Sequence, residues 1–161
     1  MRERTRRVSG GEAALKGALA GMIGGAVMMM AIKAEQKLLL PDGQQMEPPP
    51  KKLVETLAEK QGIELSDTQA MAAGMGVHMG SSALWGAVFG VVQNRLHPPD
   101  LLHGLLLGGL VYATTFPEWG LLPKMGVLPP PSQQSMEKAA IPVGAHVVFG
   151  LATAAAFDAM T

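Results

Sequence analysis

The chain has 161 residues, no cysteine, and 13 basic side chains balanced by 13 acidic ones. This length fits a single domain, the lack of cysteine excludes disulfides and thiolate metal sites, and zero net charge removes the usual argument for nucleic-acid binding. Charged residues make up 16% of the chain, against about 25% in an ordinary soluble domain, and they are crowded between four apolar windows.

The four apolar windows cover residues 13–32, 70–92, 101–116 and 139–157. A helix needs about 20 residues to cross a hydrocarbon core, with a range of roughly 17–25. The windows are apolar all round and rich in glycine, which costs a water-exposed helix about 1 kcal/mol per position but lets helices pack closely in lipid. We therefore predict an all-α fold, a four-transmembrane-helix bundle that forms one membrane domain over residues 1–161, rather than a soluble bundle.

The first window follows a basic segment and is predicted to be a retained helix. No small-x-small cleavage site follows it, and three more windows come after it, which argues against a signal peptide. With four spans, the arginines are all expected on one side of the membrane: Arg2, Arg4, Arg6, Arg7 and Arg95. The positive-inside rule then predicts that both termini lie in the cytoplasm.

The first long loop, 33–69, contains a segment with helical periodicity. Within KKLVETLAEKQG (51–62), apolar residues recur at helical spacing while lysine and glutamate occupy the other face. This pattern predicts a short amphipathic helix that lies on the membrane surface or caps the bundle. Ser66 or Asp67 is then in position to cap the helix of the second window.

The second long loop, 117–138, is too rich in proline for a regular helix through most of its length. It mixes apolar residues with few charges, so we expect it to pack on protein or on the membrane interface. Its candidate partner-docking residues are Trp119, Leu121, Leu122, Val127 and Leu128. The alternative interpretation is that the loop merely connects two helices.

Landmarks recur in the same order along the chain and predict two repeats, over about 13–92 and about 101–157. Each repeat has a Gly-x-x-x-Gly pair, then a triple proline, then a helix with Gly-x-His. A duplicated two-span unit enters and leaves on one side, so its copies are parallel and related by an axis along the membrane normal. The glycines expected to mediate helix packing are Gly17, Gly21, Gly76, Gly80, Gly104, Gly108 and Gly144.

The repeat predicts that His78 and His146 lie at equal depth in equivalent helices. Titratable residues inside a span are candidate functional residues. The pair has three interpretations: axial ligands of a haem b, donors of interhelical hydrogen bonds, or proton carriers. Neither histidine has a third ligand or a carboxylate near it in the sequence, so we expect no metal site built from protein ligands alone.

A further set of features runs along the chain. It begins with a glycine-rich first span that is followed by a lysine, an acid and a proline. It continues with a Gly-x-x-x-Gly span, a Pro–Gly-Leu–Pro loop and a helix with an early histidine. In this chain they are Lys33, Glu35, Pro41, Gly104, Gly108, Pro117, Gly120, Leu121, Pro123, Pro129, Glu137 and His146. In these features the chain resembles the small YagU-like inner-membrane proteins of bacteria, over about the first helix and residues 103–150. The resemblance implies a multi-pass protein of the bacterial inner (cytoplasmic) membrane and supplies no catalytic residues.

The sequence contains no phosphate-binding glycine loop, nucleophile elbow or zinc spacing, so we expect no enzymatic activity. We predict a non-catalytic accessory or structural subunit that packs against a larger membrane complex. Its partners would then be membrane lipids and other membrane-protein subunits. One alternative is an oligomeric small-solute or proton pathway that uses the intramembrane histidines His78 and His146. The second alternative is a bis-histidine haem-binding electron-transfer subunit.

Overall fold

The computed structural model describes residues 8–161. The regular elements in this range are all helices, and the range contains no strand. In chain order the elements are α1 (Gly10–Leu39), α2 (Pro49–Glu59), α3 (Asp67–Leu96), α4 (Asp100–Thr115), α5 (Leu121–Lys124), the 3-10 turn η1 (Pro131–Gln133) and α6 (Met136–Asp158). Each predicted window lies within one helix, α1, α3, α4 or α6, except that residue 116 of the third window follows the end of α4. The predicted amphipathic segment corresponds to α2. The arginines at positions 2, 4, 6 and 7 lie outside the described residues, so the orientation stays a prediction.

Three of the helices, α1, α3 and α6, are long and apolar enough to cross a membrane. This confirms the coarser prediction of a helical protein with membrane-capable segments. The fourth window forms α4, which has 16 residues and therefore spans about 24 Å at 1.5 Å per residue. A hydrocarbon core is about 30 Å thick, so α4 as a fourth span stays a prediction.

Serine residues begin each of the three long helices. Ser9, Ser66 and Ser135 accept a hydrogen bond from the backbone N–H three residues later, at the start of α1, α3 and α6 respectively. Ser66 also forms a capping box, because the Gln69 side chain accepts from the Ser66 backbone N–H at 2.9 Å. These bonds satisfy donors that the first turn of a helix leaves free, which fixes where each helix starts.

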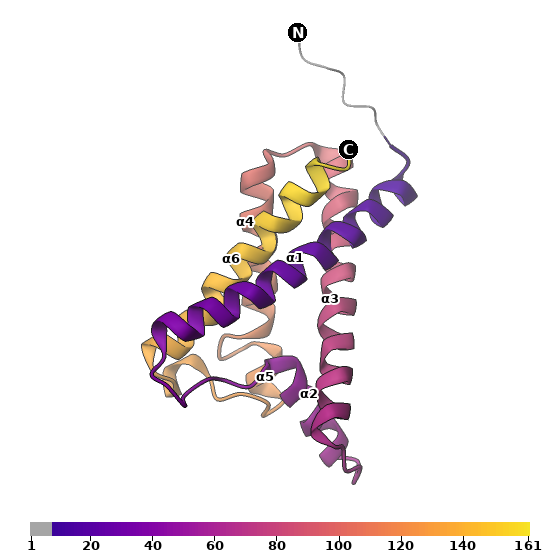
Figure 1. Cartoon of the computed structure of the whole chain (residues 1–161). Helices are drawn as coiled ribbons and strands as arrows, with labels where there is room; N and C mark the ends of the chain where they lie inside the picture. The colour runs from indigo at the N-terminus through magenta and orange to yellow at the C-terminus, as the bar shows by residue number, and fades with distance from the viewer. Residues whose placement is uncertain (1–7) are drawn as a thin grey trace.

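Helix α1 crosses α3 diagonally, runs alongside α6 and packs against both (Figure 1). Its glycines meet α3 in antiparallel order: a Cβ added at Gly17 would collide with the carbonyl of Gly86, and one at Gly21 with the carbonyl of Ser82. On the α6 side, a Cβ at Gly24 would collide with the Thr153 hydroxyl and lie 2.9 Å from the Phe149 carbonyl. Glycine is therefore required along α1 because two neighbouring helices approach its backbone.

The second hairpin repeats this arrangement with α4 and α6. A Cβ at Gly104 would lie 2.8 Å from the carbonyl of Gly150, and one at Gly108 would collide with the carbonyl of His146. Consequently α3 and α6 run in the same direction and α1 and α4 run in the opposite one, as the parallel arrangement of two hairpins requires. Gly104 and Gly108, two of the glycines predicted to mediate packing, lie at these contacts.

The two hairpins can be matched by their glycine contacts. The residues that then correspond differ from those that the Gly-x-His pattern matches. Gly21 packs against Ser82, whereas its counterpart Gly108 packs against His146. Ser82 thus holds the position in α3 that His146 holds in α6, and His78 lies one helical turn, about 5.4 Å, away from that position. Equal depth of the two histidines and an origin of the hairpins by duplication both stay predictions.

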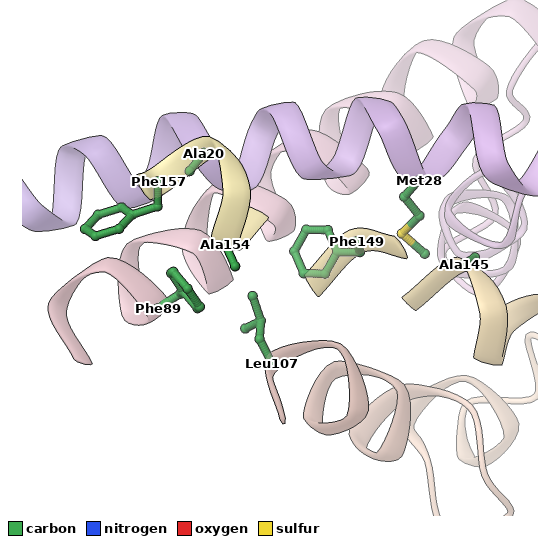
Figure 2. Close-up of a cluster of buried hydrophobic side chains, with 8 residues drawn as sticks. All are labelled: Ala20, Met28, Phe89, Leu107, Ala145, Phe149, Ala154 and Phe157. Atoms are coloured by element: carbon green, nitrogen blue, oxygen red, sulfur yellow. The ribbon is translucent and has the colours of Figure 1, made fainter. Parts of the chain in front are cut away.

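The apolar core lies where α1, α3, α4 and α6 come together (Figure 2). The rings of Phe89 and Phe157 meet edge to face, with centroids 5.8 Å apart. The cluster consists of Ala20, Met28, Phe89, Leu107, Ala145, Phe149, Ala154 and Phe157. Alanines from two helices, α1 and α6, sit beside the large rings, so small and large side chains interdigitate at close helix separation.

Helix α2 caps the start of α3 through a buried lysine. The Lys51 side chain is 7% exposed and pairs with Glu47 at 2.8 Å, Glu55 at 3.4 Å and Asp67 at 2.6 Å. Beneath it, a Cβ at Gly74 would lie 2.7 Å from the Lys51 backbone nitrogen. The pairs raise the pKa of Lys51, chiefly through the hydrogen bonds to Asp67 and Glu47. The cap therefore joins the first loop, α2 and α3 by charge.

Candidate functional site

A cavity of about 260 Å³ lies in the half of the bundle that α2 and α5 close. Its size is just below the roughly 300–1,000 Å³ of typical small-molecule pockets. All six α-helices contribute to its wall. The lining residues are Met28, Ile32, Gln36, Met46, Pro49, Pro50, Leu53, Val77, His78, Ser81, Ser82, Trp85, Val111, Thr115, Phe116, Leu121, Leu122, Ile141, Pro142, His146 and Phe149.

Helices α3 and α4 are held together near their connecting turn. Farther from that turn, both helices border the cavity. Near the turn, the Gln93 amide donates to Asp100 at 2.5 Å and its carbonyl contacts the His103 ring. The His103 ring stacks on Phe89 with centroids 4.1 Å apart. Beyond these contacts, Trp85 of α3 and Val111 of α4 face the cavity instead of each other's helix.

His78 lines the cavity and ties α3 to α1. Its Nε2 lies 3.1 Å from the carbonyl oxygen of Gly25. A carbonyl oxygen only accepts hydrogen bonds, so Nε2 carries the proton and donates it. Among the interpretations of this residue, the geometry matches the interhelical hydrogen bond, which holds α1 and α3 together in an apolar setting.

His146 lines the same cavity and is only 5% exposed. Its Nδ1 donates to the carbonyl oxygen of Pro142, one turn earlier in α6, at 2.7 Å. The edges of Tyr112 and Phe116 from the α4 side enclose the ring, with centroids 6.0 Å and 5.1 Å away. The other ring nitrogen, Nε2, makes no hydrogen bond within residues 8–161 and is the polar atom that this residue offers to a ligand.

The residues do not fit a bis-histidine haem as they are placed. An axial ligand presents a nitrogen lone pair to iron, yet Nε2 of His78 donates to Gly25 and is not available as a lone pair. A cavity of about 260 Å³ is also smaller than pockets for drug-sized ligands. Over residues 8–161, no cluster of three or more His, Asp or Glu side chains is arranged to hold a metal ion.

Two buried polar residues of the cavity wall were not singled out in the sequence. Ser82 is 5% exposed and makes no side-chain hydrogen bond with the described residues. Gln36 anchors the loop after α1, since its amide oxygen accepts from the Met46 backbone N–H at 2.8 Å. A serine one turn after an intramembrane histidine, on the same helix face, was the available signal for Ser82.

The loop predicted to dock a partner is divided between buried and exposed residues. Leu122 and Val127 are buried in the fold, so their assignment as docking residues is wrong. The turn that joins them explains this, because the Val127 N–H donates to the Leu122 carbonyl at 3.0 Å and folds both inward. Trp119 and Leu121 remain exposed, and Leu128 is half-buried.

The predicted packing glycines of α3 lie on an open face. No atom lies within 4 Å of a Cβ built at Gly76 or Gly80, so these two glycines have no packing role inside the described chain. The close packing on α3 comes instead from Gly86 and Gly90, which meet Gly17 and Ala13 of α1. Gly144 of α6 faces the Glu35 carboxylate of α1, which a Cβ there would collide with.

The site therefore consists of an apolar cavity with two imidazole nitrogens, Nδ1 of His78 and Nε2 of His146, that make no hydrogen bond within residues 8–161. On the outside of α3 it is accompanied by a glycine face without a neighbour among the same residues. Comparison of this chain with protein-family models, with curated proteins and with solved structures found no match.

Proposed function

We propose that this protein is a four-span, non-catalytic accessory subunit that packs against a larger assembly in the bacterial inner membrane. The proposal rests on the open face of α3 formed by Ala73, Gly76 and Gly80, which we call the small-residue face. Residues at this spacing lie on one side of a helix, and in lipid such a surface lets another helix approach at backbone distance.

The rest of the chain shows how its glycines behave when a helix is present. At Gly17, Gly21, Gly86, Gly90, Gly108 and Gly150, an added Cβ would collide with the backbone of the neighbouring helix. Gly76 and Gly80 repeat the same spacing with the space still open. In a lipid-exposed helix, leucine or valine would serve equally well, so two spaced glycines on such a face support a helix from another subunit as the neighbour.

Helix α4 fits this proposal as a short fourth span. Its length of about 24 Å is below the thickness of the hydrocarbon core, and short spans are accommodated by local thinning or by association with other helices. Four spans place both termini on one side. The basic residues of that side support a cytoplasmic position for both ends, and the resemblance to YagU-like proteins supports the inner membrane as the location.

The test compares the small-residue face with a matched glycine on another face. Gly109 of α4 also has nothing within 4 Å, but the exposed leucines Leu105, Leu106 and Leu110 surround it. The wild type, Gly80→Ile and Gly109→Ile are expressed with a tag, extracted in a mild detergent and measured by native mass spectrometry. Thermal unfolding of each purified chain checks that all three are folded.

We expect a hetero-complex of fixed composition with the wild type and with Gly109→Ile, and at least a tenfold lower yield of it with Gly80→Ile. A complex that survives Gly80→Ile unchanged would contradict the proposal. Recovery of a homo-oligomer alone would also contradict it and would favour the pathway that uses His78 and His146.

A further inference from the structure

We propose that the cavity between α3 and α4 binds a neutral, apolar molecule that carries a hydroxyl group, with the hydroxyl donating a hydrogen bond to Nε2 of His146. This inference goes beyond the accessory role, because it rests on the interior of the bundle and not on the small-residue face. Either proposal can fail without the other.

The wall of the cavity determines the body of the ligand. None of the lining residues is an Asp, Glu, Lys or Arg. A charged group would therefore be desolvated there without a counter-ion, which is strongly unfavourable. Apolar side chains, including valine and proline, make up most of the wall, and burial of apolar surface against them stabilises a bound molecule by about 25 cal/mol per Å².

The hydrogen bond of His146 determines the head group. Its Nδ1 carries the proton, since the Pro142 carbonyl 2.7 Å away can only accept. In the neutral imidazole, Nε2 is then an acceptor. The ligand must supply a donor, so a hydroxyl satisfies this site and an ether or ester oxygen of the same shape does not.

Ser82 adds a second polar group to the same cavity. It is 5% exposed, lines the cavity, and its hydroxyl has no partner among residues 8–161. A serine hydroxyl both donates and accepts. It therefore suits the oxygen of an alcohol, which needs an acceptor for its proton and has lone pairs that accept a further bond.

The position of the mouth indicates where such a molecule comes from. Val77 and Leu121 line the cavity but are 42% and 53% exposed, so the opening lies beside α3 and α5. Both side chains are apolar. A hydroxylated apolar molecule dissolved in the surrounding lipid can enter past them without leaving an apolar environment.

The test uses the tryptophan in the cavity wall as its reporter. The chain has two tryptophans, and Trp85 lines the cavity while Trp119 lies on the exposed loop. In a Trp119→Phe background, Trp85 is the sole fluorophore of this type. The purified protein in phosphatidylcholine nanodiscs is titrated with ω-bromo-octanol and with its methyl ether, and bromine quenching of Trp85 gives the dissociation constant of each.

We expect the alcohol to bind about three- to tenfold more tightly than the ether, the range that one net hydrogen bond provides. His146→Phe should bring the two constants together. His97→Asn serves as the matched control, because His97 is an exposed histidine outside the cavity wall, in a left-handed conformation that asparagine tolerates. This control should keep the full preference for the alcohol.

A second variant keeps the test decisive if His146→Phe does not fold. Val111→Phe fills the cavity from α4 without changing a polar group, and it should weaken binding of both probes at least tenfold. Equal constants for alcohol and ether in the wild type would overturn the proposal. Quenching that Val111→Phe leaves unchanged would also overturn it, because the bromine would then be quenching from the bilayer.

Discussion

The two ends of α3 contain the same kind of glycine pair and have opposite surroundings. Gly86 and Gly90 lie against the backbone of α1, whereas Gly76 and Gly80 face open space. The difference arises from the face of the helix. Helix α1 still reaches this part of α3, because Gly25 accepts a hydrogen bond from His78 between the two glycines, but Gly76 and Gly80 lie on a face that no described helix covers. A Gly-x-x-x-Gly pattern thus indicates that a helix can approach closely, and the fold decides whether one of its own helices does.

The largest expected effect comes from placing the same side chain at each glycine pair. Gly86→Leu drives its side chain into the backbone of Gly17 and Gly21, so we expect a loss of about 3 kcal/mol or more in the free energy of unfolding. Gly80→Leu enters open space and should change it by less than about 0.5 kcal/mol. Thermal or denaturant unfolding in one detergent measures both variants. Equal losses would show that the two ends of α3 are packed alike.

A smaller effect is expected from the cap at the open end of α3. Ser66→Ala removes the hydroxyl that accepts from the Gln69 N–H at 3.3 Å, and such N-cap losses cost about 1 kcal/mol. The loss should be local. Hydrogen exchange should become faster over 67–74 and stay unchanged over 82–93, where α1 covers the helix. Uniformly faster exchange along α3 would mean that the two ends open together.

The smallest effect concerns the acid dependence of the α2 cap. The hydrogen bond from Lys51, together with its charge, lowers the pKa of Glu47 below its ordinary value of 4.5. The stabilisation is therefore complete above pH 4.5 and is lost as the pH falls through the lowered pKa. Lys51, whose pKa is raised, stays protonated throughout this range.

Hydrogen exchange of α2, corrected for the intrinsic effect of pH, measures this loss between pH 7 and pH 3. Protection of α2 should fall below pH 4.5 while that of residues 82–93 is retained. Glu47→Gln should reduce the protection at pH 7 slightly and make it less dependent on pH. An acid response in Glu47→Gln as large as in the wild type would contradict the assignment of the effect to Glu47.

The helices could be predicted from the sequence, whereas their contacts could be predicted only in part. Apolar windows and serine caps such as Ser66 mark helices by local chemistry, and both signals correspond to elements that the structure contains. The windows are apolar all round, so no stripe shows which face meets which neighbour. Gly21 and Gly80 look alike in the sequence for this reason, and only the first has a helix against it.

The cavity could not be predicted from the sequence, because it forms where neighbouring helices do not contact each other. Its histidines were predicted to be intramembrane titratable residues, but the match between Ser82 and His146 follows from the glycine contacts and not from the Gly-x-His pattern. Leu122 and Val127 were misassigned because a short turn folds them inward. Proline and glycine in the loop indicate a turn without showing which side chains it buries.

The position of α1 between α3 and α6 also bears on how the molecule is assembled during synthesis. Glycines on the α3 side of α1 find their neighbour once the first hairpin has been made, but Gly24 packs against Phe149 and Thr153 in the last helix. That side of α1 is uncovered while the ribosome adds α2 to α5. A chain halted before α6 would therefore expose a glycine groove to lipid and to other nascent helices, which makes completion of translation the step that closes the bundle.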